Sequence, residues 1–130
     1  MNVLVTGGAG FIGSHLLQKL LQEKNRVVVL DNGSSGDYRH LAKLDVVLWK
    51  YDICDVGITK KIVDEKFDVI IHLAAQTMVD ASIKNPILDA SENIMGTLNV
   101  LEGARKCGAR VIFASTAAVY GDVSDDDLPV

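Results

Sequence analysis

Three glycines at regular spacing lie near the start of the chain, at positions 7, 10 and 13 within residues 6–14. The pattern G-x-x-G-x-x-G is a variant of the glycine pattern that lets a backbone approach a pyrophosphate. Gly7 would permit a tight turn out of a strand, Gly10 would leave room for the pyrophosphate, and Gly13 would let the next helix pack close to the sheet. Free N–H groups at the start of that helix would then bind the phosphates. The spacing predicts a dinucleotide site, with a turn needed only for packing as the alternative.

An acidic residue follows at the distance that dinucleotide sites use. Asp31 lies 18 positions after Gly13, directly after the apolar run 27–30. A carboxylate at this place accepts hydrogen bonds from ribose hydroxyls and repels a 2′-phosphate. We therefore expect NAD rather than NADP. The alternative for Asp31 is a polar residue that only forms the turn after a strand.

These residues need a sheet to bring them together, and the rest of the chain predicts one. Strands covered on both faces are expected in the short, wholly apolar runs at residues 3–5, 27–30, 46–49, 69–71 and 111–113. Helices are expected between them, at residues 11–23, 57–66 and 86–106. This alternation predicts an α/β fold, a Rossmann-type doubly wound parallel sheet with helices on both faces. The acidic residues 122–130 are predicted to form a loop.

Composition limits the classes of function. The 130 residues are enough for one domain, with 48% hydrophobic and 23% charged residues and a formal net charge of −4. No basic surface for nucleic acid or for a membrane is expected, and no apolar run approaches the roughly 20 residues of a transmembrane helix. Cys54 and Cys107 are expected to be free thiols in a cytoplasmic protein. No His, Cys or Asp cluster has metal-ligand spacing, so no metal is expected.

Several segments together resemble one family. They lie, in order, at residues 6–14, 31–32 with 34–36, 52–53, 72–76, 93–100 and 115–121. The chain resembles the extended short-chain dehydrogenases and, within them, the nucleotide-sugar 4-epimerases of the UDP-glucose 4-epimerase type. The resemblance implies an NAD-dependent isomerase that acts on a nucleotide sugar, with a UDP-hexose as the expected substrate, and that forms a homodimer at full length.

The resemblance also implies where NAD would lie. The backbone of Phe11 and Ile12 would donate to the diphosphate. Four residues after the second strand would surround the adenosine ribose: Asp31, Asn32, Ser35 and Gly36. Asp52 and Ile53 would flank the adenine, with the Asp52 carboxyl near its exocyclic amine. The full set of expected cofactor contacts is Gly7, Gly10, Phe11, Ile12, Gly13, Asp31, Asn32, Ser35, Gly36, Asp52, Ile53, Leu73, Ala74, Ala75, Gln76, Asn93 and Ser115.

Thr116 is the catalytic candidate. By resemblance it is the family's catalytic Ser/Thr, whose hydroxyl bonds the C4 oxygen of the sugar and eases proton transfer. The alternative is a strand-end threonine that satisfies backbone groups. Tyr120 resembles a structural tyrosine, and His72 is expected to be a packed strand-end residue. Asn93 would brace strand-end backbone from the long helix, with an ordinary helix-surface amide as the alternative.

The family's general base has no counterpart here. It is a tyrosine in a Tyr-x-x-x-Lys pair, where the lysine charge favours the tyrosinate. None of the three tyrosines of this chain is followed by lysine four positions later. We therefore expect residues 1–130 to be the NAD-binding, N-terminal portion of a longer enzyme. It would lack the substrate-binding C-terminal region, its sheet would be incomplete at the C-terminal side, and it would not turn over substrate by itself.

Two other functions stay open. A nucleotide-sugar 4,6-dehydratase or decarboxylase would share the fold, but such enzymes usually carry an acidic residue just after the Ser/Thr. This chain has Ala117 and Ala118 there, and the absence of this general acid favours 4-epimerisation. A non-catalytic dinucleotide-binding module is the alternative from another class, and the missing Tyr-x-x-x-Lys pair fits it.

Overall fold

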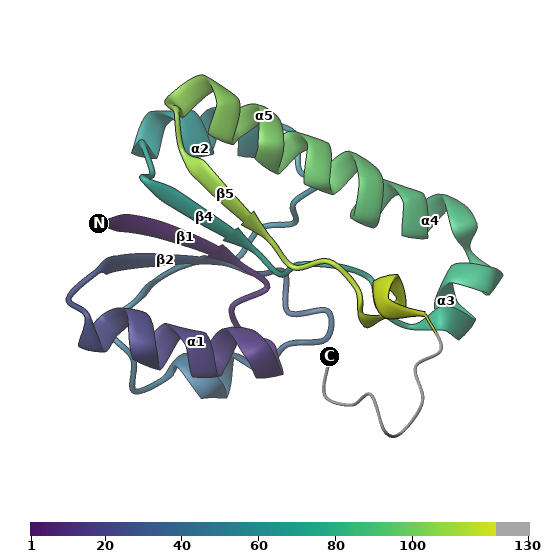
Figure 1. Ribbon diagram of the computed structural model, residues 1–130, viewed down its shortest axis with the longest axis horizontal. Coiled ribbons are helices and arrows are strands. Elements are labelled where there is room, and N and C mark those ends of the chain that lie inside the picture. Colours follow the sequence, from purple (N-terminus) through teal and green to yellow (C-terminus); the bar gives the residue numbers. More distant parts are fainter. Residues whose placement is uncertain (122–130) are drawn as a thin grey trace.

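Five parallel strands form one sheet in the order β3-β2-β1-β4-β5 (Figure 1). The computed structural model describes residues 1–121, so the predicted loop at 122–130 lies outside the described residues. The strands are β1 (Asn2–Thr6), β2 (Arg26–Leu30), β3 (Val47–Trp49), β4 (Val69–His72) and β5 (Arg110–Phe113). This strand order reverses direction at β1, as in doubly wound sheets that bind dinucleotides at that point. The predicted fold class is confirmed.

Helices cover both faces of this sheet (Figure 1). Helix α1 (Phe11–Gln22) lies on one face, and α2 (Ile58–Glu65) and α5 (Thr97–Cys107) pack together on the other. Gly103 allows the close approach of α5 to α2, because a Cβ at this position would lie 2.8 Å from Cγ2 of Ile62.

Alternate side chains of the strands belong to different hydrophobic clusters. Leu4, Val28 and Ile70 pack in the cluster that contains α2 and α5. Their neighbours along the strands pack in the cluster that contains α1: Val3, Val5, Val27, Val29 and Ile71. Successive strand side chains point to opposite faces. A sheet with helices packed on both faces therefore needs wholly apolar strands.

The helix predicted at residues 86–106 exists, but its middle is not α-helical. α4 (Pro86–Ala90) passes into the π-helical segment η2 (Ser91–Gly96) and then into α5, along one continuous ribbon (Figure 1). The prediction of one regular helix is therefore wrong in its central six residues. The π turn brings Gly96 against Ile53, where a Cβ on Gly96 would lie 2.5 Å from Cδ1 of Ile53. Three short elements were also not predicted: η1 (Tyr38–Leu41), α3 (Val79–Lys84) and η3 (Ala117–Tyr120).

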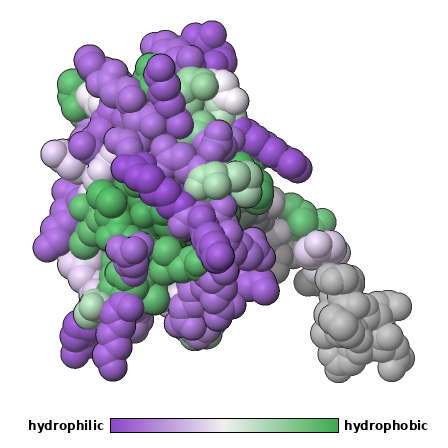
Figure 2. Space-filling view, turned by 90° about the vertical axis from the view of Figure 1, so that its left-hand side faces the viewer, coloured by the Kyte–Doolittle hydropathy of each residue, from purple (hydrophilic) through white to green (hydrophobic). Residues whose placement is uncertain are grey.

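Strand β5 forms one edge of the described sheet, and its side chains are open to solvent. Ile112 and Phe113 are 48% and 58% exposed. The end of the molecule where the strands begin presents many hydrophilic side chains around an apolar area (Figure 2). Within residues 1–121, no helix has the length and apolar character to cross a membrane, and Cys54 and Cys107 are both free thiols.

Candidate functional site

A cleft that is open to solvent lies at the carboxyl ends of β1 to β4. Open parallel sheets bind their ligands at this place. The predicted cofactor residues that line it are Gly7, Gly10, Asp31, Asn32, Ser35, Gly36, Asp52, Ile53, Leu73, Ala74 and Ala75. Residues not predicted from the sequence also line it: Leu30, Ser34, Tyr51, Thr77 and Glu92. Most of these residues are adjacent in sequence to a predicted residue near the end of a strand. That adjacency is the signal from which they could have been predicted.

The glycine turn between β1 and α1 forms one wall of the cleft. Gly7 has a φ of +69°, and a Cβ there would lie 2.8 Å from the Ala74 nitrogen after β4. A Cβ on Gly13 would lie 2.6 Å from the Gly7 oxygen. The tight packing of Gly13 is thus with the turn itself rather than with a strand, and both positions exclude a side chain.

The start of α1 offers backbone N–H groups without a side-chain cap among the described residues. Its N-cap is Gly10, and its first turn contains no acidic residue. The side chains of Phe11 and Ile12 point away from the fold and are 79% and 67% exposed. Phe11, Ile12 and Gly13 do not line the cleft, but Gly10 does. Such a helix start can bind an anion through its N–H groups and the helix dipole.

Asp31 joins the glycine turn to the loop after β2. Its carboxylate is buried and accepts hydrogen bonds from the Ala9 N–H (2.9 Å) and the Gly33 N–H (2.8 Å). It also lines the cleft. The residue therefore organises the turn, as the alternative interpretation has it, and still presents oxygen lone pairs to a ligand.

Asp52 lies across the cleft in the loop after β3. Its Oδ2 accepts from the Asn32 side chain (2.7 Å) and its Oδ1 from the Cys54 N–H (2.8 Å). Burial by itself raises the pKa of Asp52, but these hydrogen bonds outweigh burial and lower it. Asp52 is therefore a fixed, ionised acceptor at neutral pH.

Asn93 braces the backbone that follows β4. Its Oδ1 accepts from the Gln76 N–H (2.8 Å), and its Nδ2 donates to the Gln76 oxygen (2.9 Å) and to Asp89 (3.1 Å). The amide thus makes the kind of contact that the resemblance implied. Gln76 and Asn93 do not line the cleft, so their contact with a cofactor stays a prediction.

His72 connects three elements from a buried position. The Thr6 hydroxyl accepts from the N–H groups of Leu73 (3.2 Å) and Ala74 (3.1 Å), so its proton is donated to Nδ1 of His72 (2.6 Å). Nε2 of His72 must then carry a proton, which it donates to the Thr97 hydroxyl at 3.0 Å. Burial lowers the pKa of His72, so the neutral ring is the stable form. The packed position of His72 at the end of β4 is the one that the sequence predicted.

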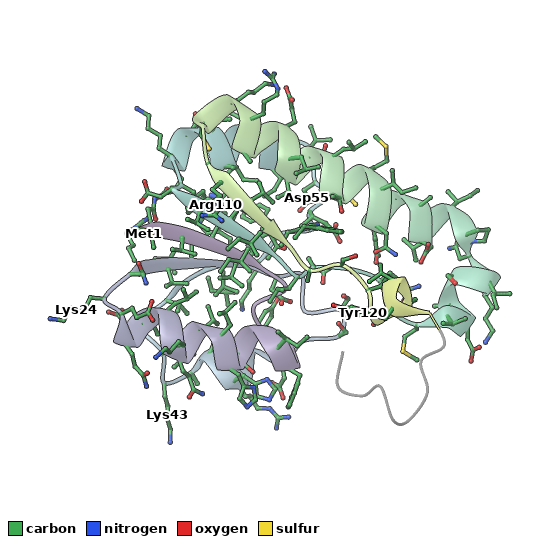
Figure 3. All side chains as sticks on the ribbon, viewed as in Figure 1. Met1, Lys24, Lys43, Asp55, Arg110 and Tyr120 are labelled. Atoms are coloured by element: carbon green, nitrogen blue, oxygen red, sulfur yellow. The ribbon has the colours of Figure 1, made fainter. Side chains whose placement is uncertain are left out.

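Thr116 lies beyond the end of β5 at the start of η3. Its hydroxyl is exposed and accepts from the Ala118 N–H at 3.2 Å, which is the backbone role of the alternative interpretation. Neither Ser115 nor Thr116 lines the cleft. Tyr120 is 58% exposed at the same end of the molecule, opposite Met1 and Lys24 (Figure 3). Among residues 1–121, no three His, Cys, Asp or Glu side chains are arranged to hold a metal ion.

Comparison with known proteins places this geometry in a family. Residues 3–129 match the model of the NAD dependent epimerase/dehydratase family. The chain belongs to this family. The match covers nearly all of the residues printed above, and it agrees with the resemblance to extended short-chain dehydrogenases.

Relatives within the NAD dependent epimerase/dehydratase family are named either as 4-epimerases or as decarboxylases. A putative UDP-glucose 4-epimerase of Methanocaldococcus jannaschii is 42% identical over 98% of this chain and 44% of that protein. UDP-glucuronic acid decarboxylase 6 of Arabidopsis thaliana is 42% identical over 94% of this chain and 35% of that protein. The crystal structure of the Thermus thermophilus UDP-glucose 4-epimerase in complex with NAD has a TM-score of 0.86 and 41% identity, over 96% of this chain and 41% of that one. The chain thus spans less than half the length of these relatives.

Proposed function

We propose that this chain is the NAD-binding portion of a nucleotide-sugar 4-epimerase that acts on a UDP-hexose. The observation that carries the proposal is the junction of the glycine turn with Asp31 at one cleft. The turn supplies N–H groups for a diphosphate, and the carboxylate lies where a ribose would follow.

The residues of the cleft fit NAD in shape and in chemistry. A Cβ on Gly36 would lie 2.9 Å from the Cβ of Ala9, so the loop after β2 lies tightly against the turn and leaves the cleft side open for a ribose. The cleft combines a helix start for two phosphates, acceptors for hydroxyls, and the apolar Leu73, Ala74 and Ala75 for the far part of the dinucleotide. These features agree with the name of the family.

NAD, when bound, would supply the hydride-transfer chemistry that inverts C4 of the hexose. The residues of this chain would hold and orient it. Phe11 and Ile12 would donate backbone hydrogen bonds to the diphosphate, and Asp31 would accept from the ribose. Thr116 would hold the C4 oxygen. His72 would not act as a base, because both of its ring nitrogens already have partners.

The decarboxylase relative keeps a second function open. Its identity to this chain equals that of the epimerase relative, so similarity alone does not choose between them. Positions 117 and 118 favour the epimerase, because both are alanine where a dehydratase or decarboxylase would place its acid. For the longer protein we propose a homodimer, since α3 and α4 carry exposed apolar side chains, among them Ile83 and Ile87. We also propose that it is cytoplasmic, because Cys54 and Cys107 are free thiols.

Cofactor choice tests the proposal. Calorimetric titration of the chain should show NAD uptake, with NADP bound at least about tenfold more weakly because Asp31 repels a 2′-phosphate. Asp31→Asn should weaken NAD binding and reduce the difference in affinity between NAD and NADP. Asp45→Asn is the control, since it removes the same charge from an exposed site. Equal affinity for the two cofactors, or no uptake of either by the folded chain, would contradict the proposal.

A further inference from the structure

The position of Ala74 in the cleft depends on a single side chain. Its N–H donates to the Thr6 hydroxyl (3.1 Å) and, within residues 1–121, to no other group. Leu73 shares its N–H between this hydroxyl (3.2 Å) and the Thr6 backbone oxygen (3.1 Å). Leu73 and Ala74 both line the cleft, and a Cβ on Gly7 would lie 2.8 Å from the Ala74 nitrogen. The Thr6 hydroxyl therefore sets how the segment after β4 lies against the glycine turn.

A chain of hydrogen bonds behind that hydroxyl leaves one arrangement of protons. The Thr6 oxygen accepts from N–H groups, so its proton is donated to Nδ1 of His72 (2.6 Å). On the other side of the ring, the Thr97 hydroxyl donates to the backbone oxygen of Asn93 (2.8 Å). The Thr97 oxygen therefore accepts from Nε2 of His72 (3.0 Å). Both ends of the chain require the same tautomer, with the proton on Nε2.

The surroundings of the His72 ring make this tautomer a property of its two hydroxyl partners. His72 is 2% exposed and Thr6 is fully buried, so water has little access to replace a lost partner. The Phe113 ring of β5 stacks on the imidazole, with the ring centroids 5.9 Å apart. Within the described part of the chain, no charged side chain hydrogen-bonds to the imidazole. The hydroxyls of Thr6 and Thr97 therefore decide which nitrogen carries the proton.

The other tautomer of His72 would disturb the wall of the cleft. With the proton on Nδ1, the ring would direct an N–H at the Thr6 oxygen, which would then face three N–H donors with two lone pairs. A buried N–H without an acceptor is unfavourable. Ala74 would be the residue most affected, because its N–H has no second partner among residues 1–121.

We propose that Thr97 and His72 are positioning residues for the cofactor, because they orient the Thr6 hydroxyl and thereby hold residues 73–74 in the conformation that binds NAD. The inference rests on the proposed NAD site. Thr6, His72 and Thr97 do not line the cleft, so they act on NAD through the backbone that they position. Thr97, at the start of α5, should therefore affect the affinity for a ligand that it does not touch.

The experiment compares substitutions that remove a hydroxyl with substitutions that keep it, by calorimetric titration with NAD. Thr6→Val should weaken NAD binding at least about tenfold, and Thr97→Val at least about fivefold, because each leaves buried donors unpaired. Thr6→Ser and Thr97→Ser keep the hydroxyl and should stay within about twofold of the wild type. This rescue by serine separates the hydrogen bonds from the packing of the side chain.

Thr59→Val is the matched control. The Thr59 hydroxyl on α2 also donates to a helix backbone oxygen, that of Asn99 (3.0 Å), but it has no contact with the chain through His72. Its loss should leave NAD affinity unchanged. Circular dichroism checks that each variant is folded. ¹⁵N NMR of the histidine-labelled chain reads the tautomer: Nε2 should carry the proton in the wild type, and Thr97→Val should raise the fraction protonated at Nδ1.

The possible results separate this inference from the proposed function. Folded Thr6→Val and Thr97→Val variants that bind NAD like the wild type would overturn the positioning roles alone. A wild-type His72 ring with its proton on Nδ1 would do the same, and this measurement holds even if Thr6→Val does not fold. Failure of the folded wild-type chain to bind NAD would overturn the proposed function as well.

Discussion

Gly10 and Gly13 are three positions apart in the same turn, yet a side chain would meet different surroundings at each. A Cβ on Gly13 would overlap the backbone of Gly7 and Gly8 at 2.6 Å. A Cβ on Gly10 would meet only the Gly7 oxygen, at 3.3 Å, and it would otherwise project toward the cleft. Gly13 is therefore needed for the fold of the turn, whereas the role that we propose for Gly10 is to leave room for the ligand.

Alanine at these two positions separates the roles. Gly10→Ala should change the free energy of unfolding by less than about 1 kcal/mol but weaken NAD binding at least tenfold, which is about 1.4 kcal/mol. Gly13→Ala should lower the free energy of unfolding by about 1–3 kcal/mol through overpacking. Urea denaturation and calorimetry measure the two effects. If Gly10→Ala bound NAD like the wild type, the phosphate turn would not be the binding element.

At the scale of elements, side-chain hydrogen bonds join the sheet to the helix that carries η2. Asn93 bonds both backbone groups of Gln76, and His72 links the hydroxyls of Thr6 and Thr97. The Thr97 hydroxyl then donates to the backbone oxygen of Asn93 at 2.8 Å. β1, β4, η2 and α5 are thus connected behind the cleft, and damage to this network should appear first as lost stability.

Removal of the Asn93 amide tests this connection. Asn93→Ala leaves the Gln76 N–H and oxygen without their partners, so the free energy of unfolding should fall by about 1–3 kcal/mol. Asn93→Asp keeps the acceptor for the Gln76 N–H but loses the donors. Near neutral pH its free energy of unfolding should lie between those of the wild type and Asn93→Ala. Urea denaturation provides the measurement. A loss below about 0.5 kcal/mol for Asn93→Ala, the size expected of ordinary surface substitutions, would mean that the brace is dispensable.

The buried His72 ring makes stability depend on pH. Burial lowers the pKa of His72 in the folded chain below its ordinary value of 6.5, so below that pH the unfolded chain binds a proton that the folded chain does not. Stability should therefore be fully present above pH 6.5 and fall as the pH drops below it, by at most about 1.4 kcal/mol per pH unit for one proton. Urea midpoints measured from about pH 7.5 to about pH 5.5 should show this slope, and His72→Asn should lack it. Equal slopes in the two proteins would rule out His72 as the source.

At the scale of the whole molecule, the β5 edge of the sheet and the segment α3–η2 expose apolar side chains to solvent. The outer strand β5 exposes Ile112 and Phe113, and α3, α4 and η2 expose Ile83, Ile87 and Ile94. Exposed strand edges and large apolar areas favour association. The 130-residue chain should therefore self-associate.

Sedimentation velocity over a range of concentrations measures this tendency. Ile112→Lys places a charge on the open edge and should shift the chain toward monomer, while a lysine in place of the exposed Val56, which lies outside that edge, should not. A wild-type chain that stays monomeric and monodisperse at high concentration would refute the prediction.

The sequence was sufficient for the parts of the fold that depend on local pattern. Strands such as residues 27–30 are apolar because they are buried on both faces, and Gly7 and Gly13 mark a turn in which a side chain does not fit. The π-helical turn and the reach of Glu92 into the cleft could not be predicted in this way. Both depend on how η2 docks against Ile53, a contact between segments far apart in the chain. Likewise, the two backbone partners of Asp31 become visible only once Ala9 and Gly33 are placed.

We propose that the amides at the start of α1 bind the diphosphate of NAD and that the loop after β2 binds its adenosine ribose. An NMR titration of the ¹⁵N-labelled chain with NAD tests it most directly. We expect saturable shifts of the amide signals of residues 10–12 and 31–36, and nearly unchanged signals for α2, which lies on the other face of the sheet from α1. Unperturbed signals at the glycine turn under saturating NAD, or shifts confined to another surface, would contradict it.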